Sequence, residues 1–184
     1  MTDFPPCKLE HFGVNVVDIH KMEAFYCASF GFVPSDRGVR FNGTNIVFLT
    51  KSADDHHQFV LIDGRAPDVE FNNINQISFA FARLEDLQAV YARLTANGVT
   101  DIMQINHGNA WSLYTKDPEG NPLELFVDSA WHTPQPCRGD LDITRPVETI
   151  LEETEALCRS RPGFATREAW SQTIRDRLAA AMAA

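Results

Sequence analysis

The sequence contains an internal repeat, in which a strand, a helix and three further strands occur twice. Residues 8–17 alternate like a strand, and apolar side chains then recur at helical spacing until Gly31. Strand-like runs follow at about 39–42, 45–51 and 57–63, separated by an Asn-Gly pair and a polar segment. The pattern begins again with a strand at 74–79 and a helical stripe from Leu84 to Leu94, which stops at Asn97-Gly98.

A shift of 65 residues aligns the two units, and at the matched positions similar side chains recur. It places His11 on Gln76, Ile19 on Leu84, Met22 on Leu87, Tyr26 on Tyr91 and Asp63 on Asp128. Two copies are too few for a solenoid, so each module is expected to bury its sheet against its twin. We therefore predict an α+β fold with two βαβββ modules, at about 8–63 and 74–128, in a paired domain covering residues 1–128.

The second module ends in YTKDPEGNPLELFVD, residues 114–128, where a tight DPEGNP turn separates two strand-like runs. Glu124 lies among apolar neighbours in the second run. Acidic side chains are seldom buried without a partner. Glu124 therefore either lies on the solvated face of an edge strand or belongs to a site.

Residues 129–184 are predicted to form a separate extension. Prolines keep residues 131–137 extended, since they disfavour helix in the residue before them. Helices are expected from Pro146 to Cys158 and from Arg167 to Ala183, the second capped by Thr166. Both are amphipathic, so they are expected to cover the sheet exterior, close over a site or form a dimer interface.

Composition narrows the possible partners. With 184 residues, a net charge of -9 and no run of Lys or Arg, the chain is not expected to bind nucleic acid or an anionic membrane. No apolar run approaches the roughly 20 residues of a membrane span, and the N-terminus lacks the pattern of a signal peptide. We expect a cytoplasmic protein. Its four cysteines lack CxxC spacing, which indicates neither disulfides nor a zinc–thiolate site.

Three motifs make the chain resemble the vicinal oxygen chelate superfamily, which includes glyoxalase I, extradiol catechol dioxygenases, fosfomycin-resistance enzymes and bleomycin-binding proteins. They are LEHFGVNVVDIHKMEAFY…GF, DHHQFVLID and SLYTKDPEGNPLELF, and the resemblance covers about residues 8–128. It implies that the two modules curl one continuous mixed sheet into a cup with a divalent metal on its inner face. Among members, the chain looks most like single-pair type I extradiol dioxygenase-like proteins.

The resemblance and the repeat together imply a set of metal ligands. Within the repeat, His11 corresponds to Gln76 and Phe59 to Glu124, which suits one metal at His11, Gln76 and Glu124. Extradiol enzymes have a histidine where this chain has Gln76. Fe(II) is the metal that the resemblance implies, while the neutral amide favours Mn, Zn or Ni. The alternative is that Gln76 only hydrogen-bonds within a site that has lost its metal.

Three further residues match positions of the extradiol enzymes. His57 precedes Phe59 by two residues, so strand alternation predicts that both face the cup. The resemblance implies that His57 moves protons, while His107 and Tyr114 orient the substrate. The alternatives are a loop histidine at position 107 and an ordinary strand tyrosine at position 114.

The sequence thus predicts a dimeric, metal-dependent dioxygenase-like oxidoreductase that cleaves a catechol-type substrate with dioxygen in aromatic compound catabolism. One alternative is a glyoxalase-like isomerase or lyase, although Phe59 stands where a second carboxylate or glutamine would be expected. The other is a metal-free module of the same fold that binds an aromatic ligand.

Overall fold

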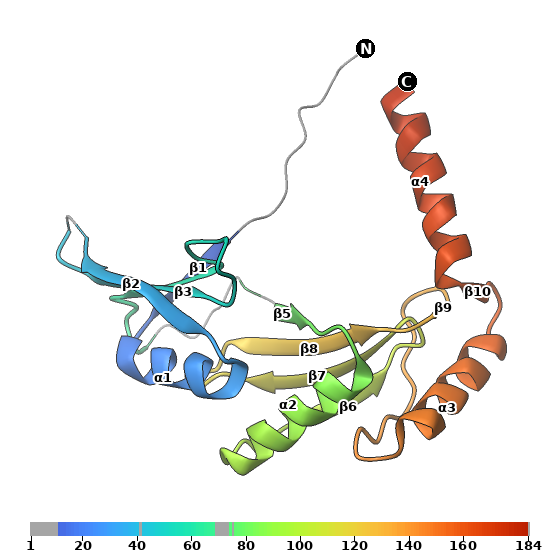
Figure 1. The fold of residues 1–184 in the computed structure, drawn as a ribbon, viewed down its shortest axis with the longest axis horizontal. Helices are drawn as coiled ribbons and strands as arrows, with labels where there is room; N and C mark the ends of the chain where they lie inside the picture. The colour runs from blue at the N-terminus through green and yellow to red at the C-terminus, as the bar shows by residue number, and fades with distance from the viewer. Residues whose placement is uncertain (1–10, 41, 69–73, 75, 184) are drawn as a thin grey trace.

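The computed structural model describes residues 11–40, 42–68, 74 and 76–183 of the chain. Both predicted modules are present, each as a strand, a helix and three strands (Figure 1). The first module consists of β1 (Phe12–Val16), α1 (Ile19–Phe30), β2 (Val33–Val39), β3 (Asn45–Thr50) and β4 (Phe59–Asp63). The second consists of β5 (Ile77–Ala80), α2 (Leu84–Ala96), β6 (Met103–Asn106), β7 (Ala110–Lys116) and β8 (Pro122–Asp128). The predicted α+β class is confirmed.

Each module forms its own four-stranded mixed sheet. The strand orders are β1-β4-β3-β2 and β5-β8-β7-β6, with the first strand of each module parallel to the last and the other pairs antiparallel. The sequence predicts one continuous curled sheet, whereas within the described residues β1 and β5 are edge strands of two separate sheets.

The alignment of the two modules shifts by one residue in their last strand. Gly13 pairs with Val60 in the first sheet, and Ser78, its counterpart in the repeat, pairs with Glu124 in the second. Val60 is therefore the counterpart of Glu124, and the predicted match of Phe59 with Glu124 is wrong. Because side chains alternate along a strand, this slip moves Phe59 to the other face. Its ring is buried at 4.6 Å from the Tyr26 ring of α1.

The local sequence explains where both helices begin and end. Asp18 caps α1 by accepting a hydrogen bond from the Lys21 backbone N–H at 3.0 Å, and Gly31 ends it in the left-handed region that glycine favours. The α2 helix has Glu85 and Asp86 in its first turn, where negative charge is favourable, and ends at Asn97. Apolar stripes of both helices contribute to a single core that spans the two modules.

The turn between β7 and β8 joins the second module to the first. Asp117 accepts a hydrogen bond from the Tyr26 hydroxyl of α1 at 3.0 Å. Glu119 accepts hydrogen bonds from the backbone N–H groups of Val17 and Asp18, just ahead of α1, and pairs with Arg65 at 2.6 Å. The DPEGN motif therefore fixes how the modules pack together.

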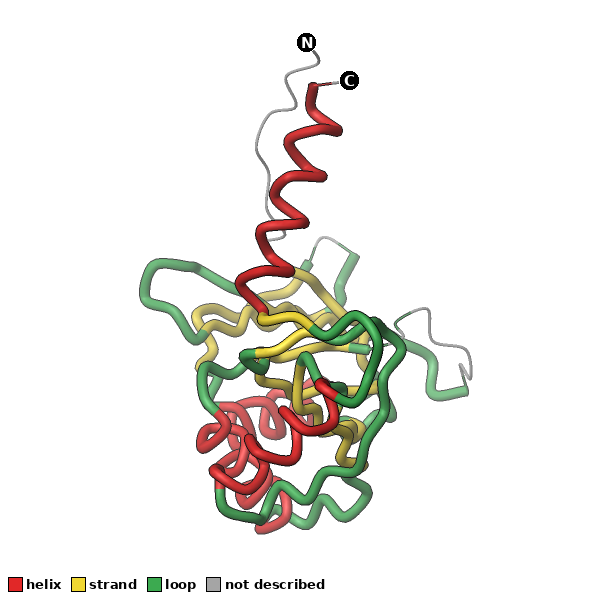
Figure 2. The backbone as a smooth tube through the Cα atoms, turned by 90° about the vertical axis from the view of Figure 1, so that its right-hand side faces the viewer, coloured by secondary structure: helices red, strands yellow, loops and turns green. Residues whose placement is uncertain are grey.

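The extension consists of β9 (Trp131–His132), α3 (Val147–Arg159), β10 (Ala165–Thr166) and α4 (Arg167–Ala183). The buried Thr154 hydroxyl of α3 accepts hydrogen bonds from the side chains of Asn106 and Trp111, which attaches the helix to the second module. Figures 1 and 2 show α4 leaving the body of the molecule as a long single helix. Within the described ranges, no helix combines the length and apolarity that crossing a membrane requires.

Candidate functional site

Glu124 is the centre of a polar network on the face of the second sheet that points away from α2. Its neighbours along β8 are buried against the helix, so alternation turns Glu124 to the opposite face, where it is half-buried. One carboxylate oxygen accepts hydrogen bonds from Ser112 at 3.0 Å and Tyr114 at 2.7 Å. The other accepts from the Gln76 side-chain amide at 2.7 Å and from Ser78 at 2.8 Å. Four donors from β7 and the β5 segment thus satisfy the carboxylate.

A chain of hydrogen bonds continues from Glu124 through Tyr114 to His107. The Tyr114 hydroxyl lies 2.9 Å from Nε2 of His107, whose Nδ1 lies 2.8 Å from the carbonyl oxygen of Cys137. A carbonyl only accepts, so Nδ1 carries a proton. The single Tyr114 proton is donated to Glu124. The Tyr114 oxygen therefore lies between the His107 imidazole and the Glu124 side chain.

Burial raises the pKa of Tyr114 to about 12, and the hydrogen bond and negative charge of Glu124 act in the same direction. The phenol therefore keeps its proton at neutral pH. A neutral phenol held in this way is a hydrogen-bond donor for an anionic oxygen.

His11 and His57 form a second cluster, on the first module. Their ring centroids are 4.3 Å apart, and Nδ1 of His57 lies 2.9 Å from Nδ1 of His56. Burial, followed by the charges of His11 and His56, lowers the pKa of His57. The strand alternation assumed for His57 and Phe59 does not apply, because β4 begins at Phe59 and His57 precedes the strand.

The structure brings together four of the six predicted site residues, namely Gln76, Glu124, Tyr114 and His107. His11 and His57 contact each other, and no hydrogen bond or ring contact joins them to those four within the part of the chain described here. The predicted ligand and catalytic roles of all six stay predictions.

The predicted three-ligand metal site stays a prediction, and the contacts of its side chains in the described chain are as follows. Gln76 turns its NH₂ group toward Glu124, whose oxygens are already satisfied by hydrogen bonds. His11 contacts His57 instead of either proposed partner. Among the described residues, no three His, Cys, Asp or Glu side chains form a group that could hold a metal ion.

Ser78, Ser112 and the Cys137 carbonyl were missed by the sequence prediction. Ser78 follows Gln76 by two residues and Ser112 precedes Tyr114 by two, so period-2 alternation places each on the same face as its predicted neighbour. The two-residue spacing therefore indicates both serines from the sequence alone. The Cys137 carbonyl has no counterpart in the sequence pattern, because its position depends on how the extension folds back onto the second module.

Comparisons with known proteins agree with this architecture. The family model described as Glyoxalase/Bleomycin resistance protein/Dioxygenase superfamily matches residues 8–125. Biphenyl-2,3-diol 1,2-dioxygenases 2 and 3 of Rhodococcus globerulus are each 28% identical over 127 residues, which cover 66% of this chain and 63% and 64% of theirs. The chain thus spans less than two thirds of the length of these relatives.

Two solved structures share the fold. A glyoxylase/bleomycin resistance protein/dioxygenase domain from Frankia sp. EAN1pec has a TM-score of 0.60 at 18% identity, covering 68% of this chain and 100% of that chain. The fosfomycin resistance protein FosX of Listeria monocytogenes, solved with Mn(II) and sulfate, has a TM-score of 0.52 at 18% identity, covering 70% of this chain and 95% of that chain.

Proposed function

The chain belongs to the glyoxalase/bleomycin resistance protein/dioxygenase superfamily, and we propose that it is an extradiol-type ring-cleavage dioxygenase acting on a catechol-type substrate with dioxygen. The observation that carries the proposal is the hydrogen-bonded series of His107, Tyr114 and Glu124. The similarity to two biphenyl-diol dioxygenases supports the same reaction class.

In this proposal, Tyr114 binds an ionised oxygen of the substrate. Its raised pKa keeps the phenol protonated, so it donates a hydrogen bond to the anionic oxygen and leaves Glu124 when substrate arrives. His107 remains bonded to the Cys137 carbonyl through Nδ1 and contacts the Tyr114 hydroxyl through Nε2. This contact holds the phenol in place. His57 is proposed to carry protons during ring opening.

The cofactor proposed for this reaction is a divalent metal, most consistent with Fe(II), with Mn, Zn or Ni as alternatives. A metal of this kind would supply a template for substrate and dioxygen and a path for electrons. The proposed ligands remain His11, Gln76 and Glu124. Gln76 and Glu124 lie together, while the ring of His11 contacts that of His57.

A metal-free module that binds an aromatic ligand is the second candidate, and one observation favours it. Four side-chain donors already occupy the two oxygens of Glu124. A glyoxalase-like isomerase is less well supported, because the counterpart of Glu124 in the first module is the apolar Val60 and supplies no second carboxylate.

Metal analysis and oxygen uptake separate these candidates. Protein purified without chelators is assayed for bound metal, reconstituted anaerobically with Fe(II) and mixed with catechol or biphenyl-2,3-diol. Stoichiometric iron with oxygen consumption and a ring-opened acid supports the dioxygenase. Aromatic binding without metal or oxygen uptake supports the module, and hemithioacetal turnover with zinc or nickel supports the isomerase.

Tyr114→Phe tests the role of the phenol. The variant removes one hydroxyl from the network, and we expect the rate of oxygen uptake to fall by about 10²-fold or more, as for loss of one charge-stabilising donor. Tyr91→Phe is the matched control, because it removes a hydroxyl from α2, outside the Glu124 network, and should leave the rate unchanged. Equal rates in Tyr114→Phe and the wild type would remove Tyr114 from the mechanism.

A further inference from the structure

A cavity of about 360 Å³ lies at the junction of the two modules and is lined largely by aromatic rings. Six phenylalanines contribute from the C-terminal end of α1 and the residues just after it, from β1 and β4, and from β5 and the residue after it: Phe12, Phe30, Phe32, Phe59, Phe79 and Phe81. Three of them (Phe30, Phe32 and Phe59) are buried, and the other three are half-buried. The volume is in the range of sites for small molecules, which are commonly apolar with a few polar groups.

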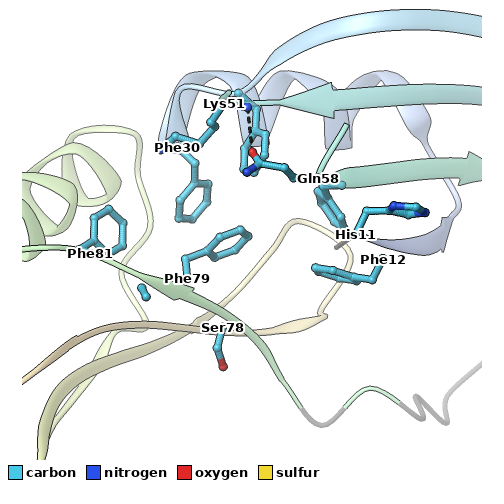
Figure 3. A pocket seen from close by; sticks show the side chains of 11 residues that line it. His11, Phe12, Phe30, Lys51, Gln58, Ser78, Phe79 and Phe81 are labelled. Carbon is cyan, nitrogen blue, oxygen red and sulfur yellow. Dashed lines mark hydrogen bonds between the residues drawn. The ribbon is translucent and has the colours of Figure 1, made fainter. Parts of the chain in front are cut away.

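Ser78 of the Glu124 network and His11 also border the cavity, but its aromatic wall lies on the opposite face of β5 from that network. Ser78 donates its hydrogen bond to Glu124 from one face of the strand. Phe79 extends from the other face and stacks on Phe30 with a centroid distance of 4.9 Å. Figure 3 shows the Phe79 ring among the other phenylalanines and the Ser78 hydroxyl pointing away from them.

One lysine, Lys51, lies at the edge of this cavity. The Lys51 ammonium is 5.9 Å from the centroid of the Phe32 ring, and the Lys51 backbone N–H is bonded to the Gln58 side chain at 3.0 Å (Figure 3). No acidic side chain is found among the described residues that line the cavity, and none of the described carboxylates forms a salt bridge with Lys51.

A neighbouring cavity, which shares Phe30, Lys51 and Phe81, adds the Arg93 guanidinium, while its one acid, Asp86, already pairs with Arg83 at 2.9 Å. Lys51 and Arg93 therefore give the edge of the phenylalanine-lined cavity an excess of positive charge.

We propose that this cavity binds a small aromatic monocarboxylate, with the ring between the phenylalanines and the carboxylate paired with Lys51. Planar rings gain edge and stacking contacts with phenylalanines beyond simple burial. A carboxylate beside an apolar wall gains more from the ammonium than it would in open water, because the local dielectric is lower. A neutral aromatic compound cannot pair with the Lys51 ammonium, and acetate has no ring to pack between the phenylalanines.

Calorimetric titration with benzoate tests the proposal, with benzyl alcohol and acetate as probes that lack the charge or the ring. We expect saturable binding of one benzoate per chain, and at least about tenfold weaker binding of both other probes. Lys51→Met should weaken benzoate binding at least about tenfold and leave benzyl alcohol unchanged, whereas Lys51→Arg should retain benzoate binding. The control is Lys116→Met, which removes an exposed lysine at the end of β7.

Three results would overturn the proposal: no saturable benzoate binding, equal affinities for benzoate and benzyl alcohol, or an unchanged affinity in Lys51→Met. Glu124→Gln distinguishes this site from the proposed catalytic one. Benzoate affinity should be the same in that variant and in the wild type. If Glu124→Gln abolishes benzoate binding, the ligand occupies the Glu124 network and the separate cavity is excluded.

Discussion

At the scale of single residues, Glu119 has the most extensive role outside the Glu124 network. Its side chain is 6% exposed and accepts hydrogen bonds from two backbone N–H groups and from Arg65. Burial alone would raise the pKa of Glu119, but the bonds from Asp18, Val17 and Arg65 outweigh it and hold the pKa below its ordinary value. The charged form of Glu119 therefore stabilises the folded state.

Glu119→Gln should lower the free energy of unfolding by about 1–3 kcal/mol at pH 7, the usual cost of weakening buried charge-assisted hydrogen bonds. A depressed pKa contributes stability above the ordinary value of 4.5, and this contribution is lost as the pH falls through the folded-state pKa. The difference between variant and wild type should thus be largest above pH 4.5 and shrink below it. Urea unfolding at a series of pH values measures it.

Glu152→Gln serves as the control for that experiment, because it neutralises an exposed acid of α3. A surface change of this kind should alter the stability by no more than about 0.5 kcal/mol. A constant gap between Glu119→Gln and the wild type through the acid range would show that the charge of Glu119 is not what stabilises the fold.

At the scale of elements, a buried hydroxyl links α3 to the second module, beside the apolar side chains that α3 adds to the core. Thr154 accepts hydrogen bonds from Asn106 at 2.8 Å and from Trp111 at 2.7 Å, and donates to the Ile150 carbonyl at 2.7 Å. Asn106 also pairs through its backbone with Gly139, so the extension continues the edge of the second sheet. This attachment holds the segment that brings the Cys137 carbonyl to His107.

Thr154→Val keeps the shape of the side chain and removes the shared acceptor. The amide of Asn106 and the indole of Trp111 then remain buried without this partner, which we expect to lower the free energy of unfolding by about 1–3 kcal/mol. Thr173→Val, on the exposed part of α4, is the matched control and should change stability by no more than about 0.5 kcal/mol. Denaturant unfolding compares the two. Equal stabilities would mean that α3 docks through its apolar contacts alone.

At the scale of the whole molecule, we propose that the chain forms a homodimer. Within the described residues, β1 and β5 are edge strands, and unpaired strand edges are surfaces on which another chain can add. His11 directly precedes β1 and Gln76 directly precedes β5, so the two separated parts of the proposed site lie beside these edges. If two copies pair at these edges, the two parts of the proposed site come closer together.

Light scattering during size-exclusion chromatography measures the oligomeric state directly. We expect a mass of twice the 20.7 kDa of one chain, and slow hydrogen exchange of the β1 and β5 amides at concentrations where the dimer forms. The mass of a single chain at all concentrations, with fast exchange along both strands, would contradict the dimer.

The sequence determined the two modules, their helices, the DPEGN turn and the extension, because these depend on local periodicity, capping residues and turn residues. Only the tertiary structure decided which face of a sheet each side chain occupies and which distant residues come into contact. A period of two leaves strand register open to a one-residue slip, so the sequence matched Phe59, instead of Val60, with Glu124. No local sequence pattern predicts that Glu119 accepts a hydrogen bond from the backbone ahead of α1, or that the Cys137 carbonyl accepts one from His107. Those contacts arise only when distant segments pack.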